Sequence, residues 1–111
     1  MPDVTIQFDK PRRLTYRWTD ARTICQRCGN ISLVEFLTRI GQTNPDVLHT
    51  ALFIGLSNED PKLTGKKLDD LVQAYIDNGG QLSALVNDVL EALTDDGILF
   101  KEKKTENPTQ S

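Results

Sequence analysis

The spacing of hydrophobic residues changes abruptly about twenty residues into the chain. Before that point apolar residues occupy every second position, in residues 4–8 (Val-Thr-Ile-Gln-Phe) and in residues 14–18 (Leu-Thr-Tyr-Arg-Trp). Beyond it they recur at i, i+3, i+4 and i+7. Alternation is typical of a half-buried strand, and the second spacing is typical of an amphipathic helix. The sequence therefore predicts a fold in which two short strands precede a set of helices.

We expect the two alternating segments to pair as a β-hairpin, with residues 9–13, which include Pro11, forming the turn. An isolated hairpin is marginal in water, so its apolar face should be buried against the helices that follow. The side chains expected on that buried face are Val4, Ile6, Phe8, Leu14, Tyr16 and Trp18.

Capping residues mark the first two expected helices. Asp20 is suited to open the first helix, which Gly29 would end. Ser32 and Glu35 have the spacing of a capping box and would open the second helix, with Gly41 at its end. Both segments carry apolar residues at helical spacing on one side.

Three further helices follow. Residues 44–45 (Asn-Pro) would start the third helix, because proline suits the first helical position. This helix, from Pro45 to about Leu56, is apolar nearly all round, which favours a central and buried position. Thr64 can cap the fourth helix, and residues 78–80 (Asn-Gly-Gly) would end it. The fifth carries the longest apolar stripe of the chain and ends near residues 95–97. The expected fold class is thus α+β, an N-terminal β-hairpin packed on a bundle of about five short α-helices.

Length and composition agree with one domain. A chain of 111 residues with 38% hydrophobic residues can build one core but not two. We place the domain at residues 1–97 and expect the polar, aperiodic residues 98–111 to be a disordered tail. No apolar run approaches the roughly 18 residues of a membrane span. Residues 1–3 do not resemble a secretion signal, and two cysteines without one favour a reducing compartment, so we expect a cytoplasmic location.

Charge is unevenly distributed along the chain. Residues 10–39 carry seven basic side chains against two acidic ones, whereas residues 40–100 carry three lysines against ten acids. Such a dipolar chain can attract another copy or a charged partner, or its charges can simply be solvated. Nucleic acid is an unlikely partner, because the aromatic residues near the arginines are expected to be buried and the pI is about 5.0. The candidate partner-binding residues are Arg12, Arg13, Arg17, Arg22 and Arg27.

Cys25 and Cys28 form the most suggestive motif for chemistry, Cys-x-x-Cys. As a zinc site it supplies half of a tetrahedron, because a second cysteine or histidine pair is missing. As a redox pair it lacks a βαβ context, and its place near the end of a helix disfavours a thiolate. We expect the two cysteines to pack as part of the apolar stripe, with a metal shared between subunits or a redox use as the alternatives.

No catalytic residue is predicted elsewhere. His49, the only histidine, has no nucleophile motif beside it. The adjacent pairs at residues 69–70 and 95–96 (Asp-Asp) point about 100° apart on a helix, which does not suit an acid/base dyad or a metal site. There is no phosphate-binding loop. We therefore predict a non-enzymatic protein without cofactor or metal.

Two sequence segments resemble a known family. Residues 29–37 read Gly-Asn-Ile-Ser-Leu-Val-Glu-Phe-Leu, and residues 52–64 read Leu-Phe-Ile-Gly-Leu-Ser-Asn-Glu-Asp-Pro-Lys-Leu-Thr. Together with a hairpin before them and two amphipathic helices after them, these segments resemble the tail assembly chaperones of long-tailed bacteriophages and their gene-transfer-agent relatives. The likeness covers about residues 4–95, whereas Cys-x-x-Cys and the arginine-rich first third are not features of the family pattern.

The resemblance implies a specific role. Proteins of this family coat the long helical tape-measure protein in the host cytoplasm, help to recruit tail-tube subunits and are absent from the finished particle. The family supplies no catalytic residues. Two other functions stay open: a small phage structural or adaptor protein, such as a tail completion factor, and a nucleic-acid-binding regulator that uses the arginines.

Overall fold

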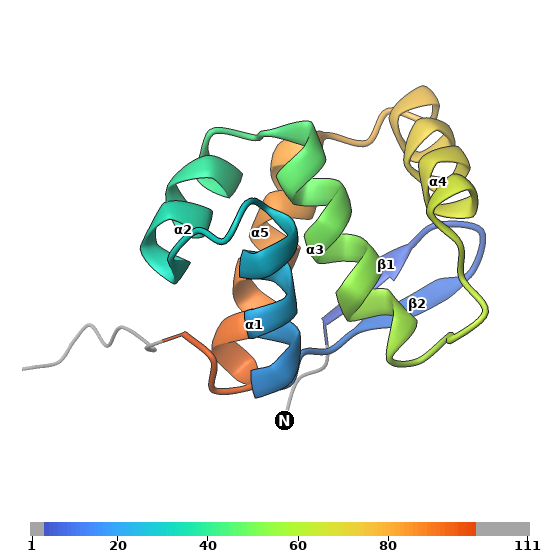
Figure 1. Cartoon of the computed structure of the whole chain (residues 1–111). Coiled ribbons are helices and arrows are strands. Elements are labelled where there is room, and N and C mark those ends of the chain that lie inside the picture. Colours follow the sequence, from blue (N-terminus) through green and yellow to red (C-terminus); the bar gives the residue numbers. More distant parts are fainter. Residues whose placement is uncertain (1–3, 100–111) are drawn as a thin grey trace, which may run out of the picture.

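A computed structural model describes residues 4–99 of the chain. Strands β1 (Val4–Gln7) and β2 (Pro11–Leu14) form an antiparallel hairpin, and five helices follow it (Figure 1). The predicted α+β architecture of a hairpin and five short helices is confirmed. The helices are α1 (Trp18–Arg27), α2 (Leu33–Gly41), α3 (Pro45–Ser57), α4 (Gly65–Asp77) and α5 (Leu82–Asp95).

Helix α3 lies at the centre of the fold, as its all-round apolar sequence predicts. It contacts β2 and every other helix, while α5 packs against both strands of the hairpin. Ala51 and Leu52 of α3 are fully buried, together with Leu85 and Val89 of α5. Helix α4 is held less extensively, since its main contacts are with α3 at the edge of the molecule (Figure 1).

Side-chain caps start three of the helices where the sequence predicts them. Ser32 Oγ accepts a hydrogen bond from the Glu35 amide at 3.0 Å, and Thr64 Oγ1 accepts one from the Lys67 amide at 3.1 Å. The Asn44 side chain accepts from two amides at the start of α3. These bonds satisfy amides that have no partner inside the helix, and each cap contributes about 1 kcal/mol.

The hairpin differs from the prediction in the extent of its second strand. Pro11 already pairs with Gln7, so the turn is shorter than residues 9–13, and β2 ends at Leu14. The alternation of residues 14–18 continues past the end of β2, whose last residue, Leu14, pairs with Val4, the first residue of β1. Tyr16 is still buried, but Trp18 begins α1 and is 70% exposed.

The start of α1 is the second difference. Asp20 is the third residue of the helix rather than its cap, and its carboxylate accepts a hydrogen bond from the Arg17 amide at 2.9 Å. The same carboxylate accepts from Asn58 Nδ2 at 2.8 Å, which ties the beginning of α1 to the end of α3. Helix α1 thus begins three residues earlier than expected, so Trp18 lies on a helix instead of a strand.

The described part of the chain extends past the expected domain boundary at residue 97. Ile98 and Leu99 pack against the core, and their amides donate hydrogen bonds to the Leu93 carbonyl. The rest of the expected tail, residues 100–111, lies outside the described residues.

Candidate functional site

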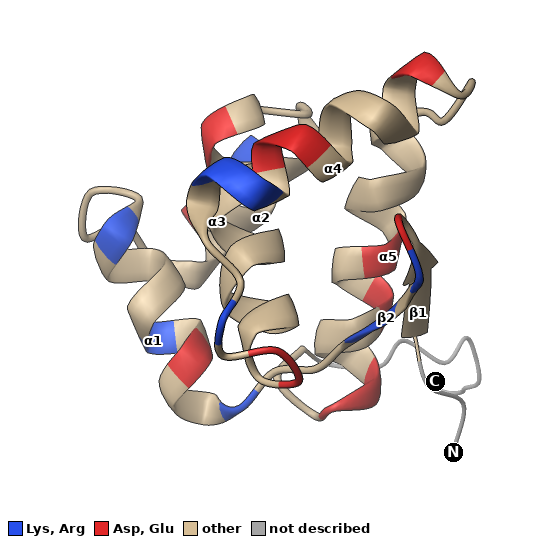
Figure 2. Ribbon diagram, turned by 90° about the vertical axis from the view of Figure 1, so that its right-hand side faces the viewer, with Lys and Arg blue, Asp and Glu red and all other residues tan. Residues whose placement is uncertain are grey.

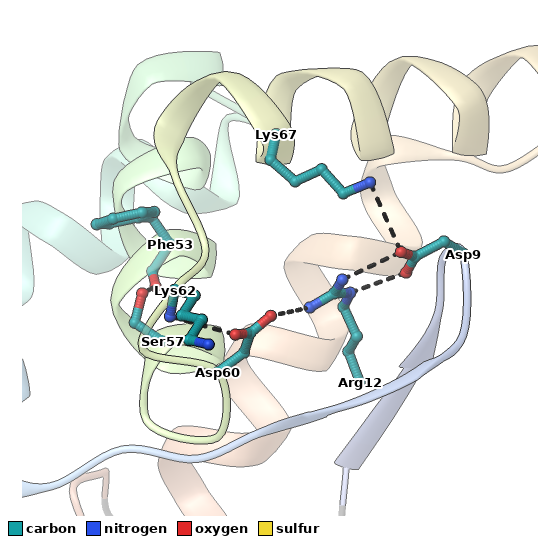
Figure 3. Close-up of polar contacts among 7 residues, drawn as sticks. All are labelled: Asp9, Arg12, Phe53, Ser57, Asp60, Lys62 and Lys67. Atoms are coloured by element: carbon teal, nitrogen blue, oxygen red, sulfur yellow. Dashed lines mark hydrogen bonds and ion pairs between the residues drawn. The ribbon is translucent and has the colours of Figure 1, made fainter.

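The five arginines expected to bind a partner do not form one surface. Arg12 lies on the inner face of β2, opposite Ile6, and only 7% of it is exposed. Its guanidinium donates two hydrogen bonds to Asp9, at 2.9 and 3.1 Å, and one to Asp60 at 2.8 Å (Figure 3). Arg12 therefore joins the hairpin to the loop after α3 and is not available to a partner.

Arg13 is also placed near a carboxylate of its own chain. It lies next to Arg12 on β2 with its side chain half exposed, and its Nη1 is 3.7 Å from Glu59 Oε2. An exposed pair at that distance contributes little to stability. Arg13 thus belongs to the same hairpin–loop junction as Arg12.

Arg17, Arg22 and Arg27 lie at the start of α1 and along it, and all three are exposed. Within residues 4–99 none of them forms an ion pair with a carboxylate. Their spacing of five residues turns each about 140° from the last, so they surround the helix instead of lining one side. The guanidinium groups of these three arginines are thus accessible to carboxylates from outside the described residues.

One face of α1 forms a hydrophobic groove with the segments around it. The groove has a volume of about 400 Å³, and Trp18 stands at its edge beside Arg22. Tryptophan and arginine are the residue types most enriched at the energetic centres of protein interfaces. The α1 groove is lined by Trp18, Ala21, Arg22, Cys25, Gln26, Asn30, Ile31, Leu33 and Ile98.

Sequence reasoning named Arg22 but missed Trp18, because the alternation of residues 14–18 placed the indole in the core. The signal that would have corrected this is Asp20, read as the third residue of a helix instead of its cap. A helix that begins at Trp18 puts Trp18, Ala21, Arg22 and Cys25 on one face. The same exposure removes one argument against nucleic acid, since Trp18 is accessible for stacking.

A second open groove lies between α3 and α4. Its volume is about 360 Å³, and its walls are mostly aliphatic. His49 lies in this groove with Nε2 3.2 Å from Asp69 Oδ1 and 3.3 Å from the Gly65 carbonyl oxygen. The lining contains no serine, threonine or cysteine that the histidine could activate. It consists of Pro45, Leu48, His49, Leu52, Asp69, Val72, Gln73, Ile76 and Leu82.

Cys25 and Cys28 are free thiols that are partly buried against the core. Burial raises the pKa of Cys25, and burial with the neighbouring Cys25 raises the pKa of Cys28. A raised pKa keeps a thiol protonated and lowers its reactivity towards metals and oxidants. Within residues 4–99 no group of three or more histidine, cysteine or acidic side chains is arranged to hold a metal ion. The pair thus packs against the core, as the apolar stripe predicts.

Comparisons with protein-family models, with curated proteins and with solved structures give no match to this chain. Among residues 4–99, no helix combines the length and the apolar character needed to span a bilayer.

Proposed function

We propose that the chain is a non-enzymatic tail assembly chaperone of the kind found in long-tailed bacteriophages. In this role it binds the tape-measure protein in the bacterial cytoplasm, shields apolar segments of that protein and helps to recruit tail-tube subunits. The resemblance of residues 29–37 and 52–64 to this family suggests the identity of the partner.

The observation that carries the proposal is the exposure of Trp18 at the edge of the α1 groove. A large aromatic side chain that is 70% exposed beside an apolar groove is typical of a surface that contacts another protein. Arg22 and its unpaired neighbours on α1 add attraction for carboxylates. A partner helix could lay its apolar side along this groove, which is a common mode of peptide recognition.

The two other functions predict different behaviour. A tail completion factor would stay in the finished particle, whereas a chaperone would be absent from it. A nucleic-acid-binding regulator would retain nucleic acid through α1, with an affinity that falls steeply as salt rises. The apolar side chains of Ile31, Leu33 and Ile98 in the α1 groove support a protein partner over a phosphate backbone.

The proposal is tested by co-expressing the tagged full-length chain with the long, helix-rich tape-measure protein that the proposal expects to be encoded beside it. We expect the two proteins to co-elute without nucleic acid and the tape-measure protein to become more soluble. A Trp18→Ala change should weaken the complex about 30-fold or more, the usual effect of removing an aromatic residue from the centre of an interface.

Val34→Ala is the matched control, because Val34 on α2 is a similarly exposed hydrophobic residue, at 73%. This variant should bind as the wild type does. Recovery of the chain in purified particles, or an eluate rich in nucleic acid and free of the tape-measure protein, would reject the chaperone role.

A further inference from the structure

Trp18 and the α3–α4 groove are two unpartnered features on separate parts of one chain. We propose that Trp18 of one copy inserts into the α3–α4 groove of a second copy, so that the chain associates with itself head to tail. This inference goes beyond the chaperone role and does not depend on the identity of any other partner.

Size and polarity suit this arrangement. The open α3–α4 groove has a volume of about 360 Å³ and is lined by the aliphatic side chains of Leu48, Leu52 and Val72. An apolar cavity of roughly 150 Å³ already binds benzene, so the larger volume accommodates an indole ring. Ile76 and Leu82 complete the wall, and Ile76 is 40% exposed.

The charges around the two features are complementary. Arg17 and Arg22 lie beside Trp18, exposed and without an ion pair in the described residues. The α3–α4 groove carries Asp69, which contacts His49 and is still 71% exposed, and Asp70 follows it on α4, 66% exposed and 3.7 Å from Lys66 Nζ. Insertion of Trp18 would bring at least one arginine towards these carboxylates. Such attraction raises the association rate and fixes orientation.

The two features face different directions. Helices α1 and α4 lie on opposite sides of α3 (Figure 1), and Figure 2 shows basic positions on α1, on β2 and at the start of α4, with acidic positions on α4 and α5. The contact therefore joins unlike surfaces and leaves a free Trp18 at one end of each dimer and a free groove at the other. A contact of this type does not close on itself unless the copies form a ring, and it extends with concentration.

The first test is sedimentation velocity of the full-length chain over a wide concentration range at low and high salt. We expect the weight-average mass to rise with concentration and to fall at high salt. Trp18 is the only tryptophan of the chain, so its fluorescence emission should shift to the blue over the same range. A monomer at every concentration would overturn the proposal.

Two variants test the two sides of the contact one at a time. Trp18→Ala removes the inserting side chain, and Ile76→Lys places a positive charge at the groove, where it repels the arginines. Each variant alone should stay monomeric, while Val34→Ala and Val34→Lys, at a similarly exposed site, should associate like the wild type. Every change is at an exposed side chain, so we expect all variants to fold. Circular dichroism checks this.

Mixing the variants decides the arrangement. The Trp18→Ala chain keeps its groove and the Ile76→Lys chain keeps its tryptophan, so an equimolar mixture should form a 1:1 dimer that cannot grow further. If Ile76→Lys alone associates like the wild type, or if the mixture stays monomeric, Trp18 does not bind the α3–α4 groove.

Discussion

Arg12 is the only buried charged side chain in the part of the chain that the structure describes. Its three hydrogen bonds to Asp9 and Asp60 use most of the N–H donors of the guanidinium (Figure 3). The Lys67 ammonium is a second cation near Asp9, with Nζ 3.8 Å from Asp9 Oδ2. The Arg12 guanidinium hydrogen-bonded to Asp9 lowers the pKa of that carboxyl from 3.8 to about 2. It also lowers the pKa of Asp60.

These pKa shifts predict how stability changes in acid. Because the folded-state pKa of Asp9 lies below its unfolded value, the unfolded chain binds more protons between pH 4 and pH 2. The stabilisation by Asp9 is therefore complete above about pH 4 and is lost as pH falls towards 2. Urea unfolding of the wild type at pH 6, 4, 3 and 2 should show this loss.

Arg12→Met is the matched variant, since methionine keeps an unbranched chain and removes the charge. We expect it to lower the free energy of unfolding at pH 6 by about 1–2 kcal/mol. It should also flatten the pH dependence between 4 and 2. An Arg12→Met chain as stable as the wild type at pH 6 would show that the junction of hairpin and loop contributes nothing.

The contact between α3 and β2 depends on a glycine. A Cβ atom on Gly55 would lie 2.6 Å from Leu14 Cδ1 and 2.6 Å from Tyr16 Cζ. Tyr16 cannot move aside easily, because its hydroxyl donates a hydrogen bond to the Ala51 carbonyl at 2.8 Å. The Thr15 amide also donates to the Gly55 carbonyl at 3.3 Å. Glycine at this position thus sets the distance between the two elements.

Gly55→Ala should therefore destabilise the protein by about 1–3 kcal/mol through overpacking, although alanine is the better helix former. Gly41→Ala is the control, because a Cβ on Gly41, at the end of α2, meets nothing within 4 Å. We expect that change to be neutral or slightly stabilising. Thermal unfolding of both variants measures the difference, and equal midpoints would contradict the role assigned to Gly55.

The boundaries of the helices show what the sequence could and could not predict. Ser32, Asn44 and Thr64 act locally, so the pattern of capping residue and apolar stripe was enough to place α2, α3 and α4. The beginning of α1 depends instead on Asp20, whose carboxylate also bonds Asn58, 38 positions along the chain. The bond of Asp20 to the Arg17 amide is local, but the contact with Asn58 is not, and the alternation of residues 14–18 favoured a strand there, so Trp18 was assigned to the core.

At the scale of the whole molecule, the candidate site also depends on contacts between residues that are distant in sequence. Composition correctly marked the first third as basic, but it could not separate Arg12, whose carboxylate partner Asp60 lies 48 residues away, from the unpaired Arg22. The two grooves are formed by elements distant in sequence, such as α1 with Ile98, so neither could be predicted. Pairing of charges within the fold decides which arginines are left for a partner.

Trp18 is the central binding residue of the proposed function, exposed until a partner covers it. The most direct measurement is the emission spectrum and acrylamide quenching of Trp18, recorded in dilute solution before and after the tape-measure protein is added. Because the chain has no other tryptophan, a tape-measure fragment without tryptophan leaves the signal to Trp18 alone. We predict a blue shift and reduced quenching in the complex. A stable complex in which both remain as in the free chain would contradict the account.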